Sequence, residues 1–121
     1  MEMKKWVFPR IPLSNNRTIR MHWAQRRKDG QAWQMVVDAV CGRPHFPTVS
    51  AVTLEITVFR NRLQDPDNAI ASLKPLIDAL NRADWLADDD CHGLTLVAHQ
   101  AKVPKKEERT EIEWKITKVG K

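Results

Sequence analysis

The amino-acid sequence predicts an α+β fold. Apolar and polar residues alternate in several short segments, which is the pattern of a half-buried strand. Two segments between them instead repeat apolar residues every three to four positions, as amphipathic helices do. A length of 121 residues with 42% hydrophobic content suits one domain with one modest core, which we expect to span residues 1–121.

The first half of the chain is predicted to contain a strand, a helix and a second strand. Residues 4–8 form the first strand, which ends at the prolines that follow. The dipeptide Asp29-Gly30 is typical of a turn, and a helix follows it over residues 31–41. The inward-facing residues of this helix are Ala32, Trp33, Val36, Val37 and Val40. Residues 48–60 are the clearest strand, because apolar and polar residues alternate there. Its predicted inward residues are Val52, Leu54, Ile56 and Val58, with Thr53, Glu55 and Thr57 on the other face.

The second half is predicted to contain a helix and then two strands. The helix spans about residues 68–83, with a buried stripe of Ile70, Leu73, Leu76, Ile77 and Leu80. Pro75 either kinks this helix or lies in the first turns of a helix that starts later, and we favour the kink. The strands span residues 93–103 and 110–119, and the charged segment between them is predicted to be a hairpin loop.

Composition and charge limit the classes of function and partner that the chain can have. A net charge of +5 and a pI near 9.5 are compatible with a polyanionic partner. No apolar run is long enough to span a membrane and no signal-peptide pattern is present, so we expect a cytoplasmic protein without a membrane partner. Cys41 and Cys91 belong to no CxxC motif, so free thiols are expected and a zinc site is not.

Carboxylates gather on either side of the second predicted helix. Asp65 and Asp67 flank a proline just before it, and the triplet Asp88, Asp89 and Asp90 follows it. A hard divalent cation such as Mg²⁺ prefers oxygen ligands and keeps several waters, so two or three carboxylates from separate loops suffice to hold it. The pattern therefore indicates a divalent-metal site.

The second helix would also present a lysine beside these acids. Ala71, Lys74 and Asp78 follow Asp67 at i+4, i+7 and i+11, so the four positions share one helical face. A lysine on this face can contact a phosphate. Acids with one lysine, in a chain of net charge +5, point toward metal-assisted phosphodiester chemistry.

Each of these features has a structural alternative. Asp67 or Asn68 can be an ordinary helix N-cap. The triplet at residues 88–90 can be a solvated turn, and Lys74 with Asp78 can be an i,i+4 surface pair. The coincidence of all three features within about thirty residues favours the functional interpretation.

A basic stretch lies ahead of the first predicted helix. Its cations are Arg17, Arg20, Arg26, Arg27 and Lys28. His22 and Trp23 lie among them. Cations interleaved with an aromatic residue suit a phosphate backbone and an exposed base, whereas the structural alternative is a solvated basic loop.

The chain resembles the RusA family of Holliday-junction resolvases, in a form common among phage-borne members. The segment FPRIPLSNNRTIR is similar to the family's proline-rich opening and its Ser-Asn-Asn-Arg loop. The segments DPDN, LKPLIDAL and WLADDD are similar, in that order, to the family's catalytic core. The resemblance spans nearly the whole chain, with two departures. Lys74 lies three residues further from Asn68 than in the founding type, and an Asp triplet replaces a pair.

This resemblance implies a small mixed α+β fold, which we expect to form two layers. A mixed β-sheet of about four to five strands would carry two main helices on one face. It also implies a homodimeric, Mg²⁺-dependent endodeoxyribonuclease, with Mn²⁺ as a substitute, that nicks four-way DNA symmetrically in recombination and repair. The substrate would be branched DNA rather than a small molecule, in a bacterial or phage-encoded protein of the cytoplasm that associates with the nucleoid.

The resemblance also assigns residues to roles. The catalytic residues would be Asp65, Asp67, Lys74 and Asp89. The metal ligands would be Asp65, Asp67 and Asp89, with Asp88 as the next choice within the triplet. The residues that contact DNA would be Asn15, Asn16, Arg17, Arg20, Arg26, Arg27 and Lys28.

Two other functions are compatible with the same residues. One is a general metal-dependent nuclease without a preference for junctions. The other is a non-catalytic or weakly selective protein that binds branched DNA, against which the intact set of acidic residues argues.

Overall fold

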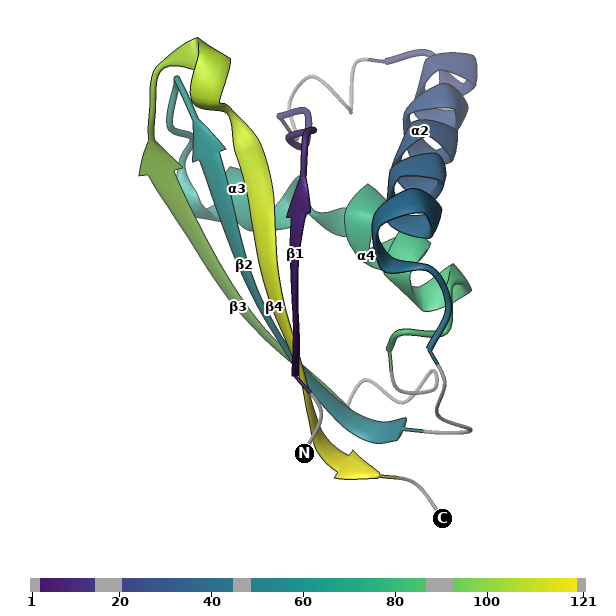
Figure 1. The fold of residues 1–121 in the computed structure, drawn as a ribbon. Coiled ribbons are helices and arrows are strands. Elements are labelled where there is room, and N and C mark those ends of the chain that lie inside the picture. Colours follow the sequence, from purple (N-terminus) through teal and green to yellow (C-terminus); the bar gives the residue numbers. More distant parts are fainter. Residues whose placement is uncertain (1–2, 15–20, 45–48, 87–92, 120–121) are drawn as a thin grey trace.

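The computed structural model of the chain describes residues 3–14, 21–44, 49–86 and 93–119. It is an α+β structure in which helices cover one face of a mixed four-stranded sheet (Figure 1), so the predicted fold class is confirmed. In chain order the elements are β1 (Met3–Phe8), α2 (Trp23–Cys41), β2 (Val49–Arg60), α3 (Pro66–Ala71), α4 (Lys74–Arg82), β3 (Leu94–Lys102), the 3₁₀ helix η2 (Lys105–Glu107) and β4 (Arg109–Val119). Among the described residues, no helix combines the length and the apolar character needed to cross a membrane.

The sheet has the strand order β1-β4-β2-β3. Strands β2 and β3 are parallel, so the chain must cross over between them, and α3 and α4 lie in that connection. Strand β4 is antiparallel to both of its neighbours, β1 and β2. Because β2 separates β3 from β4, the segment over residues 103–108 is not the predicted hairpin loop. It passes the end of β2, where the backbone N–H of Asn61 donates to Glu108 (2.9 Å) and its side-chain amide donates to the Val103 carbonyl (3.2 Å).

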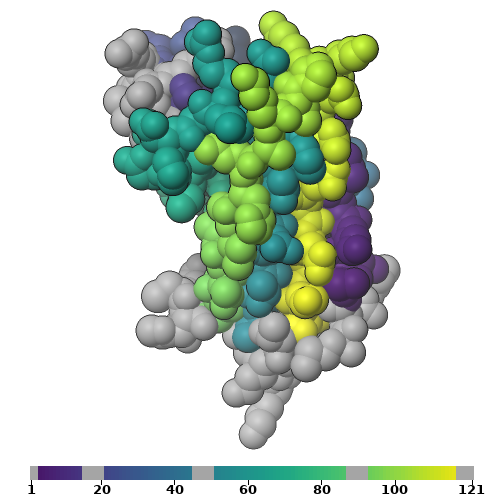
Figure 2. Space-filling model, turned by 90° about the vertical axis from the view of Figure 1, so that its left-hand side faces the viewer, coloured from purple at the N-terminus to yellow at the C-terminus, as the bar shows by residue number. Residues whose placement is uncertain are grey.

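One face of the sheet packs against the helices and the other is open. In β2 the predicted inward residues Val52, Leu54, Ile56 and Val58 are all buried. Figure 2 looks onto the opposite face, where strand side chains are at the surface without a covering helix. Polar pairs occupy that face, including His99 with Glu55 (2.9 Å) and Lys115 with Glu113 (3.6 Å). The alternation of the strands therefore divides the sheet into one buried face and one solvated face.

Helix α2 begins eight positions earlier than predicted, at Trp23 rather than residue 31. Its N-cap is His22, whose Nδ1 accepts a hydrogen bond from the Ala24 N–H (3.2 Å). The predicted turn at Asp29-Gly30 is wrong, because Asp29 is buried inside the helix and forms an ion pair with Arg10. This tertiary pair outweighs the local turn preference.

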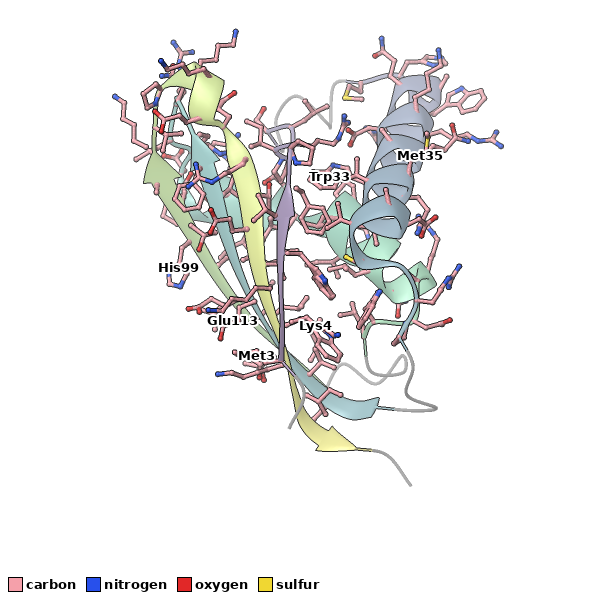
Figure 3. All side chains as sticks on the ribbon, in the orientation of Figure 1. Met3, Lys4, Trp33, Met35, His99 and Glu113 are labelled. Atoms are coloured by element: carbon pink, nitrogen blue, oxygen red, sulfur yellow. The ribbon has the colours of Figure 1, made fainter. Side chains whose placement is uncertain are left out.

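The buried stripe of α2 consists of Asp29, Trp33 and Val37, spaced four residues apart. Figure 3 shows Trp33 pointing toward the sheet and Met35 pointing away from it. Val40 was predicted to face inward but is 37% exposed, because the stripe ends one turn before it.

The single helix predicted over residues 68–83 is instead two helices, α3 and α4. Pro75 lies in the first turn of α4, where its missing N–H breaks no helical hydrogen bond, so the expected kink at Pro75 is wrong. The break falls earlier, where the Leu73 N–H bonds to the Ile70 carbonyl three residues back (3.1 Å). Ile70 is 52% exposed rather than buried, because a helical period counted across this break does not hold.

Two indole hydrogen bonds tie the helices to the sheet. Trp114, in β4, donates through Nε1 to the Trp85 carbonyl (2.7 Å), just after α4. Trp85 in turn donates through its own Nε1 to the carbonyl of Gly42, the C-cap of α2 (2.9 Å). The Trp85 ring also packs edge-on against Trp6 and Trp114, with centroid separations of 4.9 and 5.1 Å. The C-terminal end of α2 and the residues after α4 are thereby fixed on β4.

Replacement by alanine is predicted to change the stability in opposite directions at Gly30 and at Gly42. Gly30 lies inside α2 and an added Cβ would meet no atom within 4 Å, so Gly30→Ala should raise the free energy of unfolding by about 0.5–1 kcal/mol. Gly42 has φ 63° and ψ −147°, a backbone conformation that residues with a Cβ rarely adopt. Gly42→Ala should therefore lower the free energy of unfolding by about 1–3 kcal/mol. Urea unfolding measures both variants. A loss of stability in Gly30→Ala would contradict a continuous α2.

Candidate functional site

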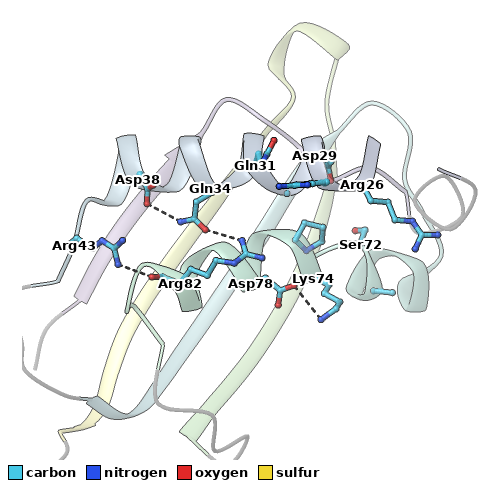
Figure 4. Close-up of a pocket in the computed structure, with 14 residues that line it drawn as sticks. Arg26, Asp29, Gln31, Gln34, Asp38, Arg43, Ser72, Lys74, Asp78 and Arg82 are labelled. Atoms are coloured by element: carbon cyan, nitrogen blue, oxygen red, sulfur yellow. Dashed lines mark hydrogen bonds and ion pairs between the residues drawn. The ribbon is translucent and has the colours of Figure 1, made fainter. Parts of the chain in front are cut away.

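A groove of about 670 Å³ runs between α2 and the α3–α4 segment (Figure 4). Basic residues outnumber acidic ones along its walls by five to three. The basic residues are Arg26, Arg27, Arg43, Lys74 and Arg82, and the acidic ones are Asp29, Asp38 and Asp78. A concave surface with an excess of positive charge concentrates the field between its walls, which favours anions.

Polar contacts join the two walls of the groove. The Gln34 amide, on α2, donates to the Ala79 carbonyl of α4 (3.2 Å), and Arg82 donates back to Gln34 Oε1 (3.2 Å). Beyond the end of α2, Arg43 donates to the Arg82 carbonyl (2.9 Å). These bonds hold α2 and α4 side by side. They also mean that Arg82 and Arg43 already make hydrogen bonds within the protein.

Lys74 lines the groove, and its ammonium group is held only by a weak ion pair. Its amino group lies 3.5 Å from Asp78, as the surface-pair alternative predicts, and its side chain is 79% exposed. An exposed i,i+4 pair contributes roughly 0.3–0.5 kcal/mol, so a phosphate can compete for this lysine. Arg26 reaches toward the same groove from α2 (Figure 4), so cations approach from both walls.

The carboxylates predicted ahead of the helix lie outside the groove. Asp65 and Asp67 are both exposed and neither lines the groove, whereas Ala71, Lys74 and Asp78 do. The proposed common face of Asp67 and Lys74 is therefore interrupted by the break between α3 and α4. The N-cap alternative is also wrong for Asp67, because Asp65 occupies the N-cap position of α3 and makes no capping hydrogen bond with its side chain.

The predicted metal ligands are only partly described. Asp88, Asp89 and Asp90 lie outside the described residues. Within the described ranges, no group of three or more His, Cys, Asp or Glu side chains is placed to hold a metal ion. Asp65 and Asp67 offer exposed oxygen donors, which suit Mg²⁺ or Mn²⁺ as part of a ligand set completed by water and further carboxylates.

The predicted DNA-contacting residues also divide into two groups. Asn15, Asn16, Arg17 and Arg20 lie outside the described residues. Arg26, Arg27 and Lys28 lie on α2, so the predicted loop is wrong for these three, but all three are exposed, as the solvated alternative expects. Arg26 and Arg27 line the groove, whereas Lys28 lines a separate hollow beside Arg10.

Two groove cations were missed in the sequence. Arg82 follows Lys74 and Asp78 at a spacing of four residues, so the helical period was a signal that could have found it. Arg43 had no such signal, because it follows the end of α2 and reaches the groove only through the fold.

Cys41, at the end of α2, is a free thiol with little nucleophilic character. Burial and the nearby charge of Asp38 raise the pKa of Cys41 to about 12. The thiol is therefore protonated at neutral pH, and the thiolate is the reactive form.

Comparisons of the chain with protein-family models and with curated proteins found no match.

The hydrogen bonds of Gln34 are predicted to maintain the groove walls. Gln34→Ala loses the bonds to α4 and should lower the free energy of unfolding by about 1 kcal/mol. Gln31→Ala is the matched control, because Gln31 is an exposed groove residue one turn earlier in α2, and its change should stay within about 0.5 kcal/mol. Urea unfolding compares the two. Equal effects would show that Gln34 does not join the walls.

Proposed function

We propose that the chain is a Mg²⁺-dependent endodeoxyribonuclease that nicks four-way DNA junctions symmetrically, as the resemblance to RusA resolvases implies. The observation that carries the proposal is the groove between α2 and α4. It brings Lys74, expected to be catalytic, together with Arg26 and Arg27, expected to contact DNA, although they are far apart in the chain.

The charge of the groove supports binding of a nucleic-acid backbone. Phosphates are bound mainly by Lys and Arg side chains, which release the counterions condensed on DNA. The groove offers such contacts on both walls, from Arg26 and Arg27 on α2 and from Lys74 on α4. Backbone contacts carry no sequence information, so a preference for junctions would come from the shape of the DNA and of a homodimer's combined surface.

The exposed carboxylates at the start of α3 are the described ligands that a metal could use. Asp65 and Asp67, with Asp89 or Asp88, are the residues that would hold Mg²⁺, or Mn²⁺ in its place. A bound divalent cation lowers the pKa of an attacking water and neutralises phosphate charge.

Lys74 would act on the scissile phosphate. Its ammonium group leaves the weak pair with Asp78 and stabilises negative charge that develops on the phosphate oxygens. Two symmetric nicks require two identical sites, which a homodimer with two-fold symmetry would supply. The protein would work in the bacterial cytoplasm, where its substrate lies in the nucleoid.

The test compares DNA shapes and metal conditions in one experiment. End-labelled four-way, forked and linear DNA are incubated with the protein in Mg²⁺ and in EDTA, and nicks are mapped on denaturing gels. The proposal predicts paired nicks in the four-way DNA with Mg²⁺ and none with EDTA. Equal cutting of all shapes would favour a general nuclease. Binding of branched DNA without any cutting would favour a non-catalytic binding protein.

Lys74→Met is predicted to separate catalysis from folding. Loss of a charge on the transferring phosphate should reduce single-turnover cleavage at least about a hundredfold, while the lost surface pair leaves stability nearly unchanged. Lys5→Met on the open face of β1 is the matched control and should cleave like the parent. Cleavage by Lys74→Met within about threefold of the parent would remove the lysine from the mechanism.

The salt dependence of binding is predicted to depend on Arg26 and Arg27. Replacing both with Gln should flatten the slope of log affinity against log salt by about one for each lost phosphate contact, on every DNA shape. Lys105 and Lys106, two adjacent exposed cations in η2, provide a matched control pair, and their replacement should leave the slope unchanged. The measurement is fluorescence anisotropy in EDTA. An equal effect of both pairs would show that the groove is not the binding surface.

A further inference from the structure

We propose that the exposed indole of Trp23 stacks on an unpaired DNA base next to the groove. The inference rests on the proposed function for its partner, DNA, and adds a contact to the base that phosphate binding alone does not provide.

Trp23 differs from the other tryptophans in its exposure. The chain contains five Trp residues. Four of them, Trp6, Trp33, Trp85 and Trp114, are at most 8% exposed, whereas Trp23 is 67% exposed. Burial in the core therefore explains the other four and does not explain Trp23. A large aromatic side chain left in solvent beside a charged groove is typical of a binding surface.

The neighbours of Trp23 hold it in a defined place. It is the first residue of α2, and the ring of His22 lies next to its indole with a centroid separation of 5.5 Å. The His22 ring is itself fixed, because its Nδ1 accepts the capping hydrogen bond from Ala24 (3.2 Å). The two rings therefore occupy an ordered position at the start of α2 rather than on a free loop.

Two arginines of the groove wall follow this aromatic pair along α2. Arg26 and Arg27 follow Trp23 at i+3 and i+4, which places the three side chains on adjoining parts of the same helix face. Both arginines line the groove. A strand whose phosphates lie against Arg26 and Arg27 would thus bring its next bases to the start of α2, about 6 Å further along the helix axis.

The chemistry favours an unpaired base over other partners. Every base has a π face on which an indole can stack, but bases inside a duplex are already stacked on their neighbours. A base at a fork, a junction crossover or a single strand is free to stack on the protein. Protein partners also use exposed tryptophans, but the adjacent arginines and the net charge of +5 favour a polyanion.

Fluorescence can observe this contact in the intact protein. Because Trp23 is the exposed one of the five tryptophans, acrylamide quenching of the protein's fluorescence reports mainly on it. The probes are oligo(dT) and a blunt linear duplex, titrated in EDTA. We expect oligo(dT) to reduce both the fluorescence and its quenching by acrylamide, and the duplex to leave the quenching unchanged. Continued quenching of the oligo(dT) complex would overturn the proposal.

Three variants make the test specific. Trp23→Ala should weaken oligo(dT) binding at least about fivefold, and Trp23→Phe should retain most of the affinity. Met35→Ala, which removes another exposed apolar side chain from α2, should bind like the parent. All three should bind the duplex equally.

The outcome separates this inference from the proposed nuclease. If Trp23→Ala binds oligo(dT) like the parent while the parent still nicks junctions, the stacking contact is wrong and the nuclease stands. If the parent binds neither DNA, both proposals are wrong. If oligo(dT) protects Trp23 but no DNA is nicked, the stacking contact stands without the nuclease.

Discussion

The arrangement of the helices depends on the two hydrogen bonds that run from Trp114 through Trp85 to Gly42. Both donors belong to buried indoles, and a buried donor that loses its acceptor costs about 1–3 kcal/mol. The bonds fix the C-terminal end of α2 and the chain after α4 to the same strand. With those ends fixed, α2 and α4 lie side by side on the sheet, and the groove lies between their outer surfaces.

Two partly or fully buried cations attach the N-terminal segment to this framework. Arg10 pairs with the buried Asp29 of α2 and lies over the Trp33 ring, 5.4 Å from its centroid. Arg60, at the end of β2, is 4% exposed and donates to the Pro12 carbonyl (3.4 Å). Burial lowers the pKa of Arg60, and the charge of Glu108 partly opposes that shift. The segment before the basic stretch is therefore tied both to the helical layer and to the sheet.

Local patterns in the sequence predicted the strands well and the helix boundaries poorly. Alternation in β2 identifies its buried face because each side chain reports on its own position. That α2 runs through Asp29 and Gly30 goes with the pairing of Asp29 and Arg10, nineteen residues apart, which no local pattern indicates. To predict the groove, one would have to know that residues near 30 and residues near 78 face each other. Lys74 and Arg82 share a helical period that marks one wall, but Arg43 joins the site only through the fold.

The central claim is that DNA binds in the groove between α2 and α4, and hydrogen exchange tests it most directly. Amide exchange is followed by mass spectrometry with and without a four-way junction in EDTA, so that binding is seen without cleavage. We predict slower exchange in the first turns of α2 and at the start of α4, with no change in β3 at the edge of the open sheet face shown in Figure 2. Protection confined to the open face of the sheet, with α2 and α4 unchanged, would contradict the claim.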